Sequence, residues 1–287
     1  MTVKRSFDSV VFAPPLVYGG VKSLYSVCEW LGDFGRSTIA PFAEPKLADW
    51  FAHKCRLYDH SYSPDVVIYP EVYQPAIEGN AFRICFALGQ LGPIEPRTDL
   101  AVCRSPEVLD WVKRQHPSMS TRLVLPSINR SVFEYDNRPK QNLICYMTRP
   151  HKYPETATLL RKKYGDQVVE IVNFSEAEVA ETLKNAKVFV WRGADTEGSP
   201  RPPKEALVAG CVVVGLKSDL NEKYHTNFGI RCSTVRKLIR MAGKALKMSV
   251  PSPEARAVIR DSEAEKKDWF ALFDALGLNG REQKTVL

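Results

Sequence analysis

Two glutamates in the second half of the chain stand in a context that suits the binding of a phosphorylated ligand. An apolar run from Val188 to Trp191 leads into a loop, a proline-rich helix start and a second apolar run that ends at Gly215. Glu197 falls in the loop, and Glu205 falls in the first turn of the expected helix. Because the first amides of a helix have no internal partner and lie at the positive end of its dipole, this segment predicts a phosphate site.

The two glutamates lie within a regular alternation of apolar strands and amphipathic helices. Before residue 127, the pattern predicts strands at 9–13, 37–40, 65–69, 99–103 and 122–126, and helices at 21–31 and after Ser105, a good N-cap followed by proline. After residue 141, it predicts strands at 142–147, 168–172, 187–191 and 211–215. Helices are expected between them at 153–164, from a capping box at Ser175 to 185, and at 202–209, 233–248 and 252–276.

This alternation predicts an α/β chain of two doubly wound, Rossmann-like domains. Strands that alternate with helices indicate parallel sheets covered on both faces. Residues 127–141 are polar and irregular, and they separate an N-terminal acceptor-side domain, 1–127, from a C-terminal donor-binding domain, 128–255. Residues 256–287 are expected to form a C-terminal helix and tail that can cross back to the first domain. Ligands bind at the carboxyl ends of such strands, so we expect the site in an interdomain cleft.

The stretch from Glu197 to Val213 resembles a known segment, EGxxxPxxEAxxxGxPVV, of retaining GT-B glycosyltransferases, especially family four, also called group 1. The resemblance implies that Glu197 approaches the donor sugar and that Glu205 binds the ribose hydroxyls of the nucleotide. A carboxylate suits the second role because it accepts two hydroxyl hydrogen bonds in fork geometry and discriminates against ligands that leave it unpaired.

Other landmarks of the same family occur in the expected order. Gly19 and Gly20 precede a helix and are similar to the glycine loop that lies against the donor phosphates. Arg149 and Lys152 follow an apolar strand, as in the loop that opens the donor domain, and the resemblance implies that they neutralise the diphosphate. Arg149, Lys152 and Glu197 are therefore the expected catalytic residues.

The remaining assignments concern the donor loop and the acceptor. Gly198, Ser199 and Arg201 surround the helix start, where they are expected to contact the donor. Glu71, in a Tyr-Pro-Glu segment, and Asn80 are assigned to the acceptor side. Residues 87–92 contain no histidine where the family usually has an active-site one, and the chain is short for the fold.

Composition limits the classes of partner. The net charge is +7, and residues 1–127 carry 13 Lys and Arg against 13 Asp and Glu, so all of it falls in residues 128–287. A basic half favours an anionic partner such as a nucleotide diphosphate or a nucleic acid. The seven cysteines are widely spaced and form no CxxC pair, which favours free thiols in a reducing compartment. Without a signal peptide or an apolar run of spanning length, a cytoplasmic protein is expected.

The sequence therefore predicts a retaining glycosyltransferase that moves a sugar from a nucleoside diphosphate sugar to an acceptor hydroxyl. No cofactor or metal is expected, because no DxD motif stands on a suitable loop and basic groups with helix amides can stabilise the leaving phosphate. The acceptor is a glycan or similar molecule. Two alternatives remain: an enzyme of the phage type that glycosylates hydroxymethylated bases in DNA, and a non-catalytic nucleotide-binding module.

Overall fold

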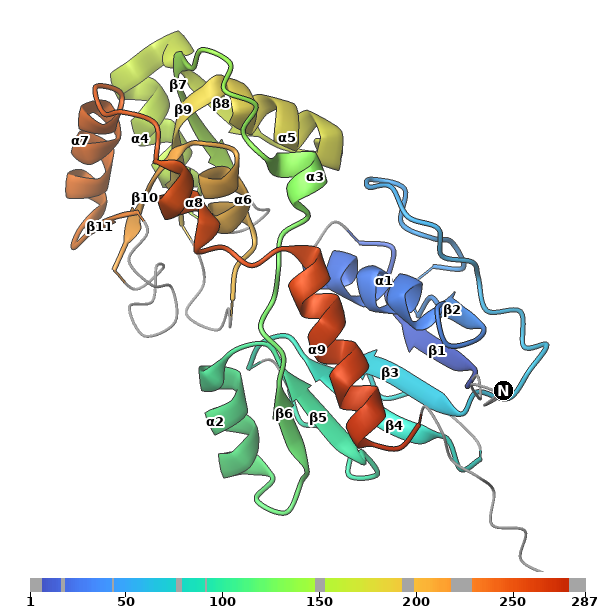
Figure 1. Cartoon of the computed structure of the whole chain (residues 1–287). Coiled ribbons are helices and arrows are strands. Elements are labelled where there is room, and N and C mark those ends of the chain that lie inside the picture. Colours follow the sequence, from blue (N-terminus) through green and yellow to red (C-terminus); the bar gives the residue numbers. More distant parts are fainter. Residues whose placement is uncertain are drawn as a thin grey trace, which may run out of the picture. The chain divides into compact units, whose positions relative to one another are not determined.

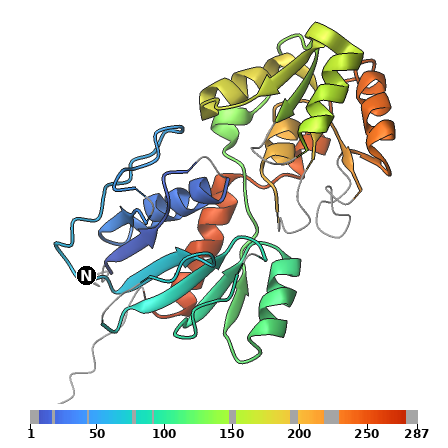
Figure 2. The ribbon, with the colours of Figure 1, turned by 180° about the vertical axis from the view of Figure 1, so that it is seen from behind.

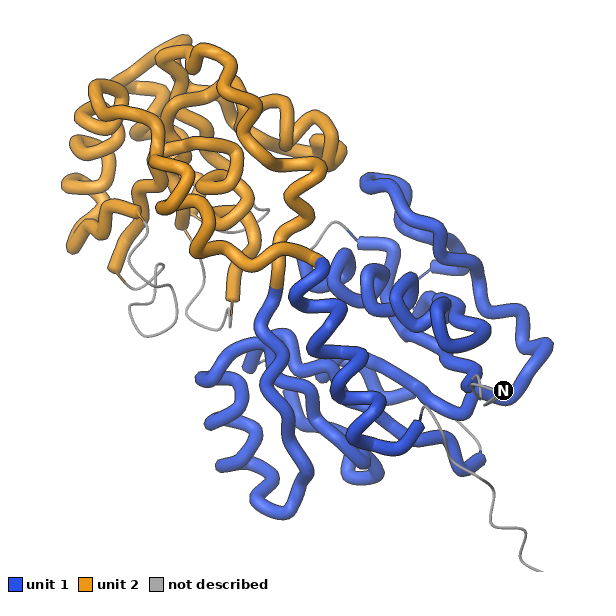
Figure 3. The backbone as a smooth tube through the Cα atoms, in the orientation of Figure 1, with its two compact units in different colours: residues 1–126, 263–287 blue, residues 127–262 orange. Residues whose placement is uncertain are grey.

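The chain folds into two compact α/β units, which Figure 3 shows in separate colours. The computed structural model describes residues 7–16, 19–42, 44–75, 79–90, 92–147, 153–192, 199–217 and 229–278. Unit 1 comprises residues 1–126 and 263–287, and unit 2 comprises residues 127–262. The chain therefore passes from one unit to the other twice, after Pro126 and after Ser262.

Unit 1 is built on a parallel sheet of six strands in the order β2-β1-β3-β4-β5-β6 (Figure 1). The strands are β1 (Ser9–Phe12), β2 (Ser37–Ala40), β3 (Val66–Pro70), β4 (Phe82–Ala87), β5 (Leu100–Cys103) and β6 (Thr121–Leu123). Its described helices are α1 (Gly19–Leu31), α2 (Pro106–Gln115) and α9 (Ser262–Ala275). Ser105 caps α2 by accepting a hydrogen bond from the amide of Val108, as the sequence predicts.

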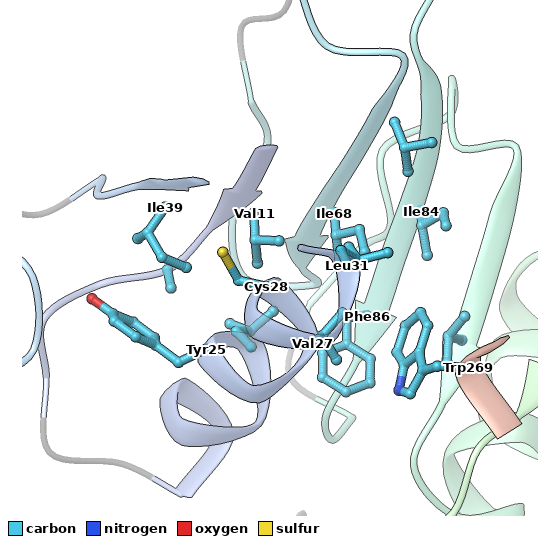
Figure 4. Packing of buried hydrophobic residues seen from close by; sticks show 14 of the residues in the cluster. Val11, Tyr25, Val27, Cys28, Leu31, Ile39, Ile68, Ile84, Phe86 and Trp269 are labelled. Atoms are coloured by element: carbon cyan, nitrogen blue, oxygen red, sulfur yellow. The ribbon is translucent and has the colours of Figure 1, made fainter. Parts of the chain in front are cut away.

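Alternate residues of each strand enter two different cores, because successive side chains of a strand point to opposite faces. On one face, Val11, Ile68 and Phe86 pack with α1 and with Trp269 of α9, as Figure 4 shows. On the other face, the neighbouring strand positions pack with α2. α9 is thus part of the core of unit 1, although 136 residues of unit 2 precede it in the chain.

Unit 2 repeats this architecture on a parallel sheet of five strands in the order β11-β10-β9-β7-β8. The strands are β7 (Gln141–Met147), β8 (Val168–Ile171), β9 (Ala186–Trp191), β10 (Val212–Leu216) and β11 (Ile230–Cys232). The helices are α3 (Arg130–Phe133), α4 (Pro154–Tyr164), α5 (Glu176–Asn185), α6 (Pro202–Val208), α7 (Val235–Ala245) and α8 (Pro253–Ala257), with a short 3₁₀ turn, η1 (Gly165–Gln167), after α4. The capping box at Ser175 and Glu178 is present, as predicted.

The helices of unit 2 divide between the two faces of its sheet. Phe189, Trp191 and Val213 belong to a core that α3, α5 and α6 share. Val188, Val190 and Val214 belong to the opposite core, which α4 and α7 share. α6 therefore lies across the sheet from α4 and α7. Among the described residues, no helix is both long enough and apolar enough to cross a membrane.

Three features differ from the sequence-based expectations. β4 and β11 were not predicted; in β4 the buried Arg83 interrupts the apolar pattern. The expected linker at 127–141 contains α3, and its Ile128 and Phe133 are buried in unit 2. The single helix expected at 252–276 is two helices, α8 and α9, because Ile259 between them packs into unit 2 whereas Trp269 packs into unit 1.

Candidate functional site

The carboxyl edge of the sheet of unit 2 gathers the segments expected to bind the donor. β7, β9 and β10 are parallel neighbours, so the chain that follows each strand emerges at the same edge. Arg149 and Lys152 follow β7, whereas Glu197 and Gly198 follow β9. These four residues lie outside the described residues, so their assigned roles remain predictions.

Ser199, Arg201, Lys204 and Glu205 form a polar cluster at the start of α6. Arg201 Nε donates a hydrogen bond to Glu205 Oε1 over 3.4 Å, and each of the two side chains is 9% exposed. Lys204 Nζ donates to Ser199 Oγ over 2.5 Å. The structure thus brings together three of the predicted donor residues, and Lys204, whose place beside the helix start already suggested a phosphate contact, lies with them in the first turn of α6.

This cluster joins two cations and one carboxylate in a nearly buried position. Burying charges costs free energy unless they are well paired and hydrogen-bonded. A carboxylate held next to a guanidinium can accept hydroxyl hydrogen bonds, and the two cations can attract an anion. α6 itself has only seven residues. The charged side chains, more than the dipole of so short a helix, therefore determine the electrostatic character of the cluster.

Arg192 is a further basic residue at this edge that the sequence reasoning missed. It is the first residue after β9, and its guanidinium carbon lies 3.8 Å from the ring centroid of Tyr153. Its Nη1 donates to Thr156 Oγ1 over 3.3 Å and lies 3.9 Å from a carboxylate oxygen of Glu155. The sequence signal is a cation directly after a buried strand, in a position that parallel sheets direct toward ligands.

In unit 1, Gly20 and Glu71 both lie next to the loop that follows β4. Gly19 and Gly20 begin α1, and a Cβ atom added to Gly20 would come within 2.7 Å of Leu88 Cδ1. The carboxylate of Glu71 accepts hydrogen bonds from the amides of Leu88 over 2.9 Å and Gly89 over 2.7 Å. Glu71 is 3% exposed, and this burial raises the pKa of its carboxyl although the two amide hydrogen bonds lower it. The contacts therefore give Glu71 a role in holding the loop after β4.

Asn80 lies at the other edge of the same sheet. It precedes β4, whereas Glu71 follows the parallel neighbour β3, so the structure does not bring these two acceptor-side candidates together. Asn80 is exposed and lines a hollow of about 770 Å³ together with Phe12, Phe42, Tyr58 and other residues. In the described part of the chain, no group of three or more His, Cys, Asp or Glu side chains is arranged to hold a metal ion.

Comparison with known proteins identifies the fold. No protein-family model matches the sequence, and no curated protein matches it by sequence search. The HepE protein of Anabaena, solved with UDP and glucose, matches 93% of this chain and 100% of that chain, with a TM-score of 0.68 and 8% identity. Sucrose-phosphate synthase from Thermosynechococcus elongatus matches 95% and 99%, with a TM-score of 0.64 and 13% identity.

An enzyme of another class shares the architecture less closely. UDP-GlcNAc 2-epimerase from Methanocaldococcus jannaschii, solved with UDP-GlcNAc and UDP, matches 93% of this chain and 99% of that chain, with a TM-score of 0.53 and 9% identity. At sequence identities this low, the structural similarity shows a shared fold and nothing more specific. Two parallel-sheet α/β units with these structural neighbours show that the chain has the GT-B fold, as its sequence predicts.

Proposed function

We propose that this chain is a retaining glycosyltransferase that transfers a sugar from a nucleoside diphosphate sugar to an acceptor hydroxyl of a glycan. The observation that carries the proposal is the polar cluster of Ser199, Arg201, Lys204 and Glu205 at the carboxyl edge of a GT-B sheet. HepE, which shares the fold, was solved with UDP and glucose, and this supports a UDP-sugar as the donor.

In this proposal each basic or acidic residue of the edge acts on one part of the donor. Glu205 accepts the ribose hydroxyls, and Glu197 approaches the sugar. Arg149 and Lys152 neutralise the diphosphate, and Arg192 adds positive charge at the same edge. As the glycosidic bond breaks, negative charge grows on the leaving phosphate, and preorganised donors aimed at such charge typically contribute a factor of about 100 to 1000 each. No metal is needed in this scheme, and front-face attack on an oxocarbenium-like centre accounts for retention.

A glycan fits the charge distribution better than DNA does. The acceptor is expected on the side of unit 1, and the chain up to residue 127 carries equal numbers of basic and acidic residues. A DNA acceptor would favour a basic surface there, because phosphate neutralisation supplies most of the affinity for nucleic acids.

The nucleotide site is tested by the Glu205→Ala variant and thermal unfolding with UDP. At about 100 times its dissociation constant, a ligand stabilises the protein by about 2.7 kcal/mol. The variant loses charge-assisted hydrogen bonds of about 1.5–3 kcal/mol, so we expect UDP affinity to fall about 10- to 100-fold. Glu254→Ala, which removes an exposed carboxylate of α8, is the matched control and should bind UDP normally. Normal UDP binding by Glu205→Ala would contradict the ribose role.

Turnover separates the enzyme classes. Incubation with UDP-glucose, UDP-GlcNAc and related donors should release UDP slowly by hydrolysis and faster with a suitable glycan. UDP binding without any donor turnover would indicate a non-catalytic module. Conversion of UDP-GlcNAc to its C2 epimer would indicate the epimerase activity found on the same fold, and transfer to hydroxymethylated DNA would identify the alternative acceptor.

A further inference from the structure

The outer surface of α7 is positively charged along its whole length. Residues 229–253 contain no Asp or Glu. Lys237, Arg240, Lys244 and Lys247 are exposed and recur every three or four residues, so they form one stripe about 15 Å long. The opposite side of α7 is held in the core through Leu238, Ile239 and Ala242.

The last turn of α4 extends this stripe. Tyr164 Oη donates a hydrogen bond to the carbonyl of Ile239 over 2.7 Å, and its ring fills the space beside Gly243. α4 and α7 therefore lie side by side, as Figures 1 and 2 also show. Lys162 and Lys163 are exposed next to this contact. We call the combined surface the basic face; it consists of Lys162, Lys163, Lys237, Arg240, Lys244 and Lys247.

The basic face is separate from the proposed donor site. Glu205 belongs to α6, which packs on one side of the sheet of unit 2, whereas α4 and α7 pack on the other side. Arg192 contacts the first turn of α4, whereas Lys162 and Lys163 lie in its last turn. The six cations point away from the sheet into solvent, and within the described part of the chain none of them forms an ion pair with a carboxylate. Arg161 of the same turn differs, because it pairs with Glu170. Within the described residues, the positive charge of the basic face therefore serves no internal ion pair.

Two exposed aliphatic side chains accompany the cations. Leu159 of α4 is 43% exposed and lies three and four residues before Lys162 and Lys163, so the three share one side of the helix. Met248, also 43% exposed, directly follows Lys247, three residues after the end of α7. The basic face thus combines positive charge with two exposed apolar side chains.

We propose that the basic face docks this protein on the surface of an anionic lipid bilayer. Clusters of four to eight Lys and Arg residues attract anionic lipid headgroups, and aliphatic side chains among them can enter the interface. Because the apolar side of α7 is buried in unit 2, the helix stays in the protein and docking uses headgroup contacts. A bilayer fits better than a nucleic acid, because two aliphatic side chains, Leu159 and Met248, are exposed beside the cations, whereas no described aromatic ring is exposed among them for base stacking. This inference does not rest on the proposed function.

Vesicle co-sedimentation of the full chain tests the proposal. We expect binding to phosphatidylcholine vesicles that contain about 30 mol% phosphatidylglycerol, little binding to phosphatidylcholine alone, and release at about 0.5 M NaCl, where screening shortens the reach of surface charges. Each cation near an anionic surface is worth about five-fold in affinity. The triple variant Lys162→Gln, Lys244→Gln, Lys247→Gln should therefore bind about 100-fold more weakly.

A second triple variant, with the same change in net charge, distinguishes the loss of the basic face from the loss of positive charge in general. Lys113→Gln, Arg114→Gln, Arg122→Gln removes the same charge from exposed positions of unit 1 and should bind these vesicles within about two-fold of the wild type. Leu159→Ser with Met248→Ser should weaken vesicle binding without changing its salt dependence. All variants should keep the wild-type melting temperature and UDP affinity, so that a failure of docking is distinguishable from a failure of the donor site.

Three results would overturn the proposal. The first is no preference of the wild type for anionic vesicles. The second is an equal loss of binding in both triple variants, which would make the effect one of net charge. The third is tight binding of duplex DNA at physiological salt that the basic-face variant abolishes while vesicle binding is unchanged, which would identify a nucleic acid as the partner.

Discussion

Arg201 and Glu205 form a contact that a nucleotide bound in the proposed donor site would share. The hydrogen bond of 3.4 Å between them is longer than the usual range for charge-assisted pairs. In the proposed donor site, ribose hydroxyls would share the Glu205 carboxylate with this guanidinium. The hydrogen bond from Arg201 gives the nearly buried carboxylate of Glu205 a charged partner within unit 2.

Glu71 should lower the stability of the protein as pH rises, whereas a salt-bridged carboxylate would raise it. Burial raises its pKa above the ordinary value of 4.5, so its contribution is fully present below that value and is lost as pH rises through the folded-state pKa. We therefore expect the unfolding free energy of the wild type, relative to Glu71→Gln, to fall as pH rises from about 4 to about 7. Urea titrations of both proteins across this range measure the difference.

Asp8 supplies the control with the reverse slope. The hydrogen bond from the Arg36 side chain lowers the pKa of Asp8 below 3.8, so its contribution is present above that value and is lost as pH falls. Relative to Asp8→Asn, the wild type should lose stability on acidification. If the Glu71 pair also lost stability on acidification, the amide hydrogen bonds would lower the pKa of Glu71 by more than burial raises it.

At the scale of elements, Gly210 fixes the end of α6 and so the position of Glu205. It has a φ of +83°, and a Cβ atom there would come within 2.8 Å of Tyr135 Cγ. Gly210→Ala should therefore destabilise the protein by about 2–4 kcal/mol, through left-handed strain of about 1–2 kcal/mol and the added clash. Urea denaturation measures this loss, and UDP affinity should fall with it.

Gly277 is the matched control for this prediction. It also has a positive φ, +65°, after the end of α9, but no atom lies within 4 Å of its added Cβ. Gly277→Ala should cost only the strain, about 1–2 kcal/mol. Equal losses in the two variants would show that the contact with Tyr135 adds nothing.

The elements that the sequence predicted share strong local signals. Caps at Ser105 and Ser175 and apolar runs such as 187–191 identified helices and strands to within a few residues. In β4 the buried arginine, Arg83, interrupts the run of apolar residues, so the local sequence does not predict this strand. The break between α8 and α9 depends on which unit each helix packs against, which periodicity does not reveal. The same holds for Arg192, whose partners on Tyr153 and Thr156 are distant in sequence.

At the scale of the whole molecule, unit 1 depends on its C-terminal helix. Arg104 Nη1 donates to Glu265 Oε1 over 2.5 Å and to the carbonyl of Val124 over 3.2 Å, and its guanidinium lies 4.9 Å from the ring centroid of Phe86. Trp269 packs edge-on against the same Phe86 ring at 5.4 Å. A buried ion pair and an aromatic contact thus help to attach α9 to the rest of unit 1.

Removing one partner of this ion pair should lower the free energy of unfolding by more than removing both partners does. Glu265→Leu leaves Arg104 buried without its carboxylate, which typically costs about 3–5 kcal/mol. The double variant Arg104→Met, Glu265→Leu should recover much of that loss, because apolar replacements of a buried pair are often neutral. Calorimetry should place both changes in the unfolding transition of unit 1. Additive losses would contradict the coupling.

The discontinuity of unit 1 also determines the order in which the protein can be completed during synthesis. Domains generally fold in the order in which the ribosome releases them. Here the first six strands emerge early, but Glu265 and Trp269 leave the exit tunnel only after all of unit 2. Unit 2 can therefore reach its native state first, and the nascent N-terminal sheet must wait with one apolar face incompletely covered. During that interval the exposed apolar face makes the growing chain prone to aggregation.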